Sequence, residues 1–241
     1  MLFCAENGHI FGGNMNRRVV LIVDGQEQLR HALNERNYQA CVSSASDAPR
    51  AYAANQPVLV VVDGNGVPSA GLEVCRSLRA ISDVPILVLA TEMDEVDELL
   101  AYALGADDCM IGDLSIRRFV AKVAALTRHK KSHSVEASQK LLRHGIISLD
   151  AATRQVKVAE RAVSLTRTEF DILAMLMHRP EHVVTRGSLV QEIWPDWFGE
   201  ESVIEVHISR LRRKIIDADG PRVVEAVRGV GYRFGILRPA G

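Results

Sequence analysis

The sequence predicts an α/β protein in which a doubly wound, five-stranded parallel sheet is followed by a smaller winged helix-turn-helix domain. In the first half, short apolar runs of strand character alternate with helical patterns, which is typical of a parallel sheet covered on both faces. Near the end, a basic amphipathic helix precedes two strand-like runs separated by glycines. With 241 residues, 47% of them hydrophobic, the chain is long enough for two separate cores.

Residues 1–16 are rich in glycine and asparagine and show no apolar period, so we expect a flexible extension. This stretch lacks the basic start and the continuous apolar core of a secretory signal. Met15 directly precedes the first strand-like run and is an alternative start of translation. No apolar run approaches the roughly 18 residues that a membrane span needs, which predicts a cytoplasmic protein without a membrane partner.

Residues 17–128 contain strand-like runs, each followed by a helical pattern. The runs are VVLIVD (19–24), ACVSS (40–44), VLVVVD (58–63), PILVLA (85–90) and DDCMIG (107–112). The helical patterns lie near residues 26–37, 46–54, 71–80, 95–104 and 115–127. Sheets of this kind bind ligands beyond the carboxyl ends of their strands, where the strand order reverses. Asp24 and Asp63 each close a strand, so we expect both carboxylates to converge there.

The four cysteines lack the spacing of a metal site or a redox motif, and the charges are unevenly distributed along the chain. Cys4, Cys41, Cys75 and Cys109 are scattered without CxxC spacing, which favours free, mostly buried thiols in a reducing compartment. From Ala137 onward, 16 Lys+Arg stand against 13 Asp+Glu (net +3), whereas the preceding part has 13 against 17 (net −4). The basic part is therefore the better candidate for binding a polyanion.

Residues 129–140 are polar and charged and are interpreted as a linker to the second domain, residues 141–238. That domain is predicted to begin with a small sheet made of GIISLD and VKVAERAVSL. A helix near 167–178 ends before Pro180, a second helix covers 185–194, and a loop runs from Trp194 to Gly199. The apolar face of the first helix consists of Phe170, Ile172, Leu173 and Leu176, which are expected in the core.

Residues 201–216 form the basic amphipathic helix. At 100° per residue its apolar face consists of Ile204, Ile208, Leu211 and Ile215. The opposite face carries Ser202, Val206, Ser209, Arg210 and Arg213. Small residues let a helix approach a surface closely, and arginine binds phosphate or pairs bidentately with guanine. The alternative interpretation is an ordinary helix with a solvated basic face.

Residues 222–236 read as a β-hairpin, with Gly229 and Gly231 marking its turn and Arg228 near its tip. A basic helix followed by such a hairpin is the pattern of a winged helix. Residues from about Gly145 to Ile236 resemble the effector domain of OmpR/PhoB-family response regulators, because SLTRTEFDIL, TRGSLVQEIW, VHISRLRRKI and VRGVGYRF match in order and spacing. Residues 17–128 resemble a flavodoxin-like receiver domain, through LIVD, VVVD, GLEVCRSLR, VPILVLA and LGADD.

This resemblance implies a sequence-specific transcription regulator that is not an enzyme. Its partners would be double-stranded DNA with promoter repeats, a second copy of the chain and RNA polymerase. Arg210, Arg213, Ser202 and Val206 would read the DNA through the basic helix, with Ser209 between them, and Arg228 would enter the minor groove.

The resemblance also identifies a depleted phosphorylation pocket. In the family an aspartate accepts a phosphoryl group, paired carboxylates hold magnesium, and a lysine and a Thr/Ser hydroxyl bind the phosphoryl oxygens. Asp63 stands at the acceptor position and Asp24 at the first acidic position. The second acidic, the Thr/Ser, the aromatic and the lysine positions hold Gly25, Ala90, Cys109 and Gly112. Magnesium binding is therefore expected to be weak or absent, and no metal or cofactor is expected.

Two further readings of this pocket stay open. Thr91 adjoins Ala90, but strand alternation would point its hydroxyl to the opposite face. Asp63 is interpreted as a structural carboxylate that accepts N–H groups of the following loop, and binding of another ligand is the sharper alternative. The competing functions are a conventional regulator switched at Asp63 and a protein-interaction adaptor that binds no specific DNA.

Family members dimerise through the fourth helix, the fifth strand and the fifth helix of the receiver, using ion pairs between subunits. One family pair maps onto Glu98 and Arg118 with exchanged signs. A second maps onto Asp108 and Lys122 without exchange. The alternative is a chance arrangement of surface charges, because exposed pairs contribute only about 0–1 kcal/mol. The sequence thus predicts a constitutive homodimer that avoids ordinary relatives.

Overall fold

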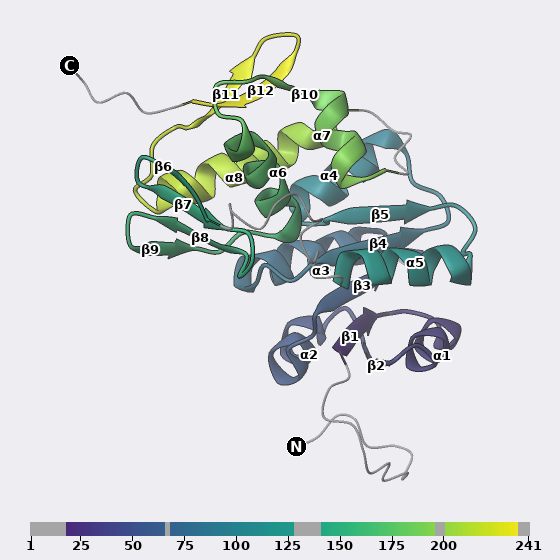
Figure 1. Cartoon of the computed structure of the whole chain (residues 1–241). Helices are drawn as coiled ribbons and strands as arrows, with labels where there is room; N and C mark the ends of the chain where they lie inside the picture. Colours follow the sequence, from purple (N-terminus) through teal and green to yellow (C-terminus); the bar gives the residue numbers. More distant parts are fainter. Residues whose placement is uncertain (1–17, 66–67, 128–140, 196–200, 236–241) are drawn as a thin grey trace, which may run out of the picture. The chain divides into compact units, whose positions relative to one another are not determined.

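The computed structural model describes residues 18–65, 68–127, 141–195 and 201–235 (Figure 1). The chain divides into two compact units, Met1–Arg128 and His129–Gly241. The predicted extension 1–16, with Cys4 and Met15, and the predicted linker 129–140 lie outside the described residues, as does most of the predicted loop after Trp194. Within the described part of the chain, no helix has the length and apolarity to cross a bilayer.

The N-terminal unit is the predicted doubly wound α/β fold. Its parallel strands are β1 (Arg18–Val23), β2 (Tyr38–Ser43), β3 (Leu59–Asp63), β4 (Ile86–Ala90) and β5 (Asp108–Ile111), in the order β2-β1-β3-β4-β5. The helices are α1 (Glu27–Asn34), α2 (Ala48–Asn55), α3 (Pro68–Ile81), α4 (Glu95–Leu104) and α5 (Ile116–Thr127). Every strand and helix predicted for residues 17–128 is present. The order reverses between β1 and β3, which places the ends of these two strands at the switch point.

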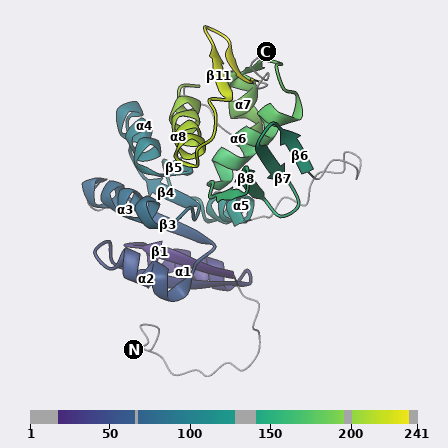
Figure 2. The ribbon, with the colours of Figure 1, turned by 90° about the vertical axis from the view of Figure 1, so that its left-hand side faces the viewer.

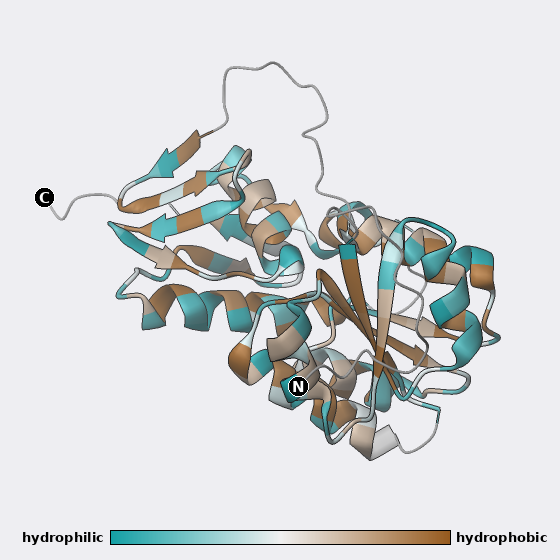
Figure 3. Ribbon diagram, turned by 90° about the horizontal axis from the view of Figure 1, so that it is seen from below, coloured by the Kyte–Doolittle hydropathy of each residue, from teal (hydrophilic) through white to brown (hydrophobic). Residues whose placement is uncertain are grey.

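The sheet is buried on both sides, which explains its nearly continuous apolar runs. Figure 3 shows the central strands coloured hydrophobic along most of their length, whereas the surrounding helices alternate. Alternate residues of β1 serve opposite faces: Val20 and Ile22 pack in one cluster with Leu29 of α1 and Phe119 of α5. The helices α3 and α4 contact each other on the other side of the fold.

A buried ion pair fastens α3 to the start of β5. The guanidinium of Arg79 lies 2.6 Å from an Asp107 carboxylate oxygen, with only 9% and 0% of the two side chains exposed. Arg79 also donates to the carbonyls of Gly105, Ser82 and Val84, and Asp107 accepts the backbone N–H of Ile86 at 3.0 Å. The pair therefore joins α3, the end of α4 and the edge between β4 and β5.

The C-terminal unit is the predicted winged helix. It consists of β6 (Leu141–His144), β7 (Ile147–Asp150), β8 (Gln155–Val158), β9 (Arg161–Val163), α6 (Arg167–His178), β10 (Val184–Thr185), α7 (Arg186–Ile193), α8 (Val203–Asp217), β11 (Val224–Val227) and β12 (Gly231–Phe234). The three helices lie between the antiparallel sheet β6–β9 and the β11–β12 hairpin (Figure 2). Phe170, Ile172, Leu173 and Leu176 are buried, as predicted for the core face of α6.

Local sequence explains where α6 begins. Thr166 caps the helix through its hydroxyl, and Glu169 accepts the Thr166 backbone N–H at 2.9 Å, which together form a capping box. The carboxylate of Glu169 is fully buried, and the ammonium of Lys214 on α8 reaches it at 2.9 Å. Lys214 therefore ties α8 to α6 and is turned away from the outer face of α8.

Two short strands were not predicted. β6 follows a charged stretch, and β10 has only two residues, so neither has an apolar run long enough to show a period. β10 explains one of the glycines. A Cβ at Gly231 would lie 2.1 Å from the Val184 carbonyl oxygen, so Gly231 permits close pairing of β10 with β12. Only Gly229, with φ of 72°, belongs to the turn, and the prediction that Gly231 marks it as well was wrong.

Candidate nucleic-acid interface and acidic pocket

The outer face of α8 is shorter and less basic than predicted. Ser209 and Arg213 are exposed and Val206 is half-buried, so these three lie where the sequence placed them. Ser202 precedes the first turn of α8 as its N-cap and makes no capping hydrogen bond through its side chain. Glu205, which was not among the predicted residues, is exposed on the same face. This face thus combines an exposed arginine and a carboxylate with small side chains.

The prediction that Arg210 belongs to this exposed face was wrong, because only 7% of the residue is exposed. At 100° per residue Arg210 lies beside Val203, which is fully buried. The reason is that α8 contacts both α6 and α7, so the buried side of the helix is wider than its stripe of isoleucine and leucine suggests. Arg210 therefore contributes to the packing of the unit in this structure.

Two arginines absent from the predicted site flank Tyr232 of β12. The guanidinium carbons of Arg186 and Arg212 each lie 5.7 Å from the centre of its ring. Arg186, at the start of α7, also forms an ion pair with Glu205 at 3.1 Å, and Arg212 donates to the Val224 carbonyl at 2.8 Å. Burial, followed by the charge of Glu205, raises the pKa of the Tyr232 hydroxyl. These contacts fix α7, α8 and the hairpin into one surface.

The hairpin presents Arg228 as predicted. Arg228, Gly229 and Val230 form the exposed turn between β11 and β12. The turn is anchored to the rest of the unit because the Arg186 N–H donates to the Val230 carbonyl at 3.3 Å. A positive side chain at the tip of an anchored hairpin is placed to reach a phosphate or a groove beyond α8.

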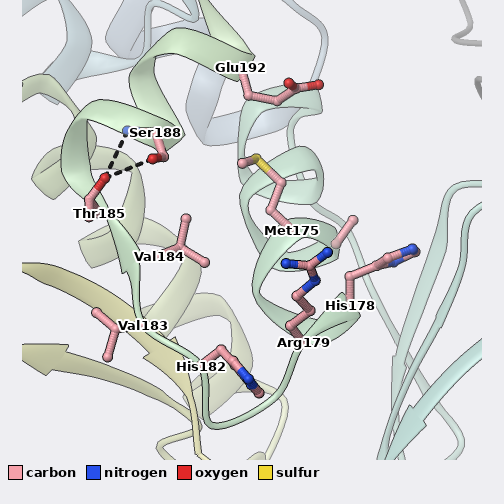
Figure 4. A pocket seen from close by; sticks show the side chains of 10 residues that line it. Met175, His178, Arg179, His182, Val183, Val184, Thr185, Ser188 and Glu192 are labelled. Atoms are coloured by element: carbon pink, nitrogen blue, oxygen red, sulfur yellow. Dashed lines mark hydrogen bonds between the residues drawn. The ribbon is translucent and has the colours of Figure 1, made fainter.

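Beside the start of α7 lies an open hollow of about 700 Å³ (Figure 4). Its wall includes Thr185, which caps α7 by accepting the Ser188 N–H at 3.1 Å. Met175 and Val184 contribute apolar surface, and Glu192 lies at the other end of the hollow from His182. The hollow adjoins the N-terminal end of α7, where the positive end of the helix dipole favours a negatively charged ligand.

In the N-terminal unit, the carboxylates expected at the switch point are both occupied by hydrogen bonds. Asp24, with φ of 52°, follows β1, and its side chain accepts the Ala45 N–H at 3.2 Å. Asp63 closes β3, and one of its oxygens accepts both the backbone N–H and the side-chain amide of Asn65, at 3.1 and 2.8 Å. The interpretation of Asp63 as an acceptor for the following loop is therefore confirmed.

Thr91 lies closer to this pocket than predicted. Its hydroxyl donates to the Asn65 side-chain oxygen at 2.7 Å, and its backbone N–H donates to the same oxygen. The alternation argument failed because β4 ends at Ala90, so Thr91 belongs to the loop that follows. Asn65, which the sequence did not single out, thus connects Asp63 with Thr91.

The backbone at two of the replaced positions disfavours the side chains that the resemblance implies for a phosphorylated receiver. A Cβ at Gly25 would lie 2.1 Å from the Ile22 Cγ2 atom, so an acidic residue there requires Ile22 to move. Gly112 has φ of 94°, which strains any L side chain, including lysine. Ala90 is buried and offers no hydroxyl. Among the described residues, no group of three or more His, Cys, Asp or Glu side chains could hold a metal ion.

Cys109 is buried beside a tyrosine from α4. The Tyr102 hydroxyl accepts the Cys109 backbone N–H at 3.2 Å, and the Tyr102 side chain is among the largest fully buried ones. Burial, reinforced by Asp108 and Glu98, raises the pKa of the Cys109 thiol well above its usual value. Cys41, Cys75 and Cys109 are buried and form no disulfide, as predicted for the described cysteines.

Of the two predicted ion pairs, Asp108 with Lys122 is formed within one chain, whereas the described residues show no contact between Glu98 and Arg118. Asp108 and Lys122, which were predicted to pair between subunits, also contact each other within one chain: the Lys122 ammonium donates to both Asp108 oxygens at 2.7 Å. Adjacent β5 and α5 bring them together, which sequence spacing did not reveal. Partial burial and the charge of Asp108 raise the pKa of Glu98 on α4. Arg118 is exposed and forms no ion pair with the described residues.

Comparisons with known proteins agree with this architecture. Residues 160–234 match the family model described as "Transcriptional regulatory protein, C terminal". The response regulator MprA of Mycobacterium bovis is 38% identical over 228 residues, which cover 90% of this chain and 97% of the relative. MprA of Mycolicibacterium vanbaalenii is 37% identical over 88% of this chain and 95% of its own. A solved structure of a RitR mutant has a TM-score of 0.66 at 21% identity, over 91% of this chain and 100% of that one, which shows the fold alone.

Proposed function

Because this chain belongs to the OmpR/PhoB family of response regulators, we propose that it is a sequence-specific transcription regulator whose receiver works without phosphorylation. Membership of this family makes the chain a DNA-binding response regulator. The observation that carries it is the Asp63 carboxylate, whose oxygen already accepts two hydrogen bonds from Asn65. Gly25 and Gly112 stand where magnesium and phosphoryl oxygens would need a carboxylate and a lysine.

The charges around Asp63 also favour a receiver that works without phosphorylation. A phosphoryl group adds roughly −1.5 to −2 charges at neutral pH, which need cationic partners. Asp24 stands at the first acidic position of the pocket, and the exposed Asp113 directly follows Gly112 at the lysine position, so both of these charges are negative. A phosphorylated Asp63 would therefore be poorly compensated.

The proposed DNA surface combines the outer face of α8, the start of α7 and the hairpin. Arg213 is placed to pair with a base edge or a phosphate in the major groove, with Val206 and Ser209 allowing close approach. Glu205, held by Arg186, is a candidate acceptor for a cytosine amino group. Arg228 is the proposed minor-groove contact. The partner is promoter DNA with repeated half-sites, bound in the cytoplasm, with RNA polymerase as a further partner.

We expect the receiver to remain unmodified by small phosphodonors. Incubating the full chain with acetyl phosphate and magnesium should give no mass increase of about 80 Da, because the phosphoryl charge would lack a lysine and a bound cation. Asp63→Asn, which retains an acceptor oxygen for Asn65, should leave DNA affinity within about twofold. Intact-mass spectrometry and DNA titration measure the two effects. Stoichiometric modification of Asp63 together with tighter DNA binding would instead establish the conventional switch.

The dimer is proposed to form through α4, β5 and α5, with Glu98 facing Arg118 of a second copy. Arg118→Glu should weaken self-association, by up to about fivefold for an exposed pair, and adding Glu98→Arg should restore it. Arg117→Glu, also exposed on α5, is the matched control and should have a smaller effect. Sedimentation equilibrium measures the dimer constants. Failure of the double variant to recover association would remove this ion pair from the interface.

Chromatin mapping of bound sites tests the DNA-binding function against the adaptor alternative. A regulator should occupy discrete sites that share a repeated motif, and Arg213→Ala should lower the occupancy of these sites. An adaptor would show no sequence-dependent occupancy and would be unaffected by Arg213→Ala.

A further inference from the structure

The loop that precedes α4 is held by a chain of hydrogen bonds that starts at the acceptor position. Asp63 closes β3, and Thr91 directly follows β4, the neighbouring strand. Asn65 lies between them and uses both ends of its side-chain amide. Its NH2 group donates to Asp63 at 2.8 Å, and its oxygen accepts from the Thr91 hydroxyl at 2.7 Å and from the Thr91 backbone N–H.

We propose that Asn65 is a built-in positioning residue that connects Asp63 to Thr91 permanently and thereby fixes the start of α4. A phosphoryl group on an aspartate forms such a connection only while it is attached, since it accepts a hydrogen bond from a hydroxyl on the next strand. In this chain the corresponding position is Ala90, which has no hydroxyl. An uncharged amide makes the connection instead and requires neither a lysine nor a cation.

The remainder of α4 is also fastened. Asp94 caps its first turn by accepting the Asp97 N–H at 2.8 Å. Tyr102, fully buried on the inner side of α4, accepts the Cys109 N–H of β5 at 3.2 Å. Past the last turn, the Gly105 carbonyl accepts two N–H groups of Arg79, at 3.2 and 2.7 Å. The loop before α4 is more exposed than the contacts of Tyr102 and Arg79, and there Asn65 supplies the connection.

The consequence concerns the proposed dimer. With both ends of α4 held, Glu98 keeps one position relative to β5 and α5 without any modification. The inference rests on the proposed function, because it explains how the receiver dimerises when it is not phosphorylated. Dimerisation without phosphorylation then depends on the side chain of Asn65, which lies outside the proposed interface.

Hydrogen exchange on the full chain tests this role. Asn65→Ala should raise the exchange rates of amides in residues 91–98 by about tenfold and weaken dimerisation by about fivefold, while the unfolding midpoint changes little. Thr91→Val, which keeps the backbone N–H but removes the hydroxyl, should give a smaller effect in the same direction. Asn34→Ala is the matched control. The Asn34 side-chain oxygen also accepts a backbone N–H, that of Ala40, but Asn34 lies at the end of α1 and not beside α4.

The outcomes separate this inference from the proposed function. Phosphoryl uptake at Asp63 with tighter DNA binding would overturn the proposed function itself. An unmodified, dimeric chain in which Asn65→Ala and Thr91→Val leave both the exchange rates and the dimer constant unchanged would overturn only the role of Asn65. If Asn65→Ala strongly lowers the unfolding midpoint, Thr91→Val becomes the deciding variant. Faster exchange in residues 91–98 at an unchanged midpoint then supports the role of Asn65, and unchanged exchange overturns it.

Discussion

Replacing Arg79 with methionine should lower the free energy of unfolding of the N-terminal unit by about 3–5 kcal/mol. The substitution leaves the fully buried Asp107 carboxylate without its cation, and removes donors to the Gly105, Ser82 and Val84 carbonyls. A buried charge without compensation is far more costly than the loss of an exposed pair. Urea denaturation of the full chain, followed by hydrogen exchange of the β4 and β5 amides, measures the loss.

A matched control lies on the same helix. Arg76 pairs with Glu73 at 2.6 Å, but 65% and 58% of these two side chains are exposed, so Arg76→Met should cost less than about 1 kcal/mol. Adding Asp107→Asn to Arg79→Met should recover part of the stability, because the buried group is then uncharged. Equal losses for Arg79→Met and Arg76→Met would contradict the importance of the buried pair.

The order of elements could be predicted because each one has a local signal. The apolar runs of the sheet appear directly in the sequence, and the Thr166 capping box marks the start of α6. β6 and β10 escaped because their stability comes from partners elsewhere in the chain. The same holds for Gly231. A glycine is needed there because of the Val184 carbonyl, which lies 47 positions earlier in the sequence (231 − 184).

The site residues divide in the same way. Gly25, Ala90 and Gly112 are informative as residue types, so the depleted pocket could be recognised from the sequence alone. Asn65 could not, since its role depends on how two loops meet. Helical periodicity alone also misassigned Arg210, because the width of a buried face depends on how many elements pack against the helix.

The dimer pairs show a further limit of sequence reasoning. Asp108 and Lys122 match a family pair that forms between subunits, and in this structure the two side chains contact each other within one chain. Burial, which favours the uncharged carboxyl, raises the pKa of Asp108, and Lys122 opposes this effect. Glu98 and Arg118 are therefore the more suitable pair to test the interface.

Replacing Arg213 with alanine should weaken binding to a specific site by about 1–3 kcal/mol, or roughly 5- to 150-fold. Arg213 is the exposed arginine of the outer face of α8, whereas Arg212 stacks on Tyr232 and Lys214 pairs with Glu169. Its planar guanidinium can pair with a guanine edge, which a lysine ammonium cannot imitate bidentately. Titration of labelled operator DNA at several salt concentrations measures both affinity and salt dependence.

Two variants separate base reading from phosphate binding. If Arg213 reads a base, Arg213→Lys should lose most of the specific affinity while keeping nonspecific affinity. If it binds only phosphate, Arg213→Lys should behave nearly as the unmodified chain, and Arg213→Ala should lower the salt slope by about one. Arg161→Ala on β9 removes the same charge from an exposed position outside the proposed surface, so it controls for net charge. An Arg213→Ala protein that binds its operator as tightly as the Arg161→Ala control would show that α8 does not read DNA through this face.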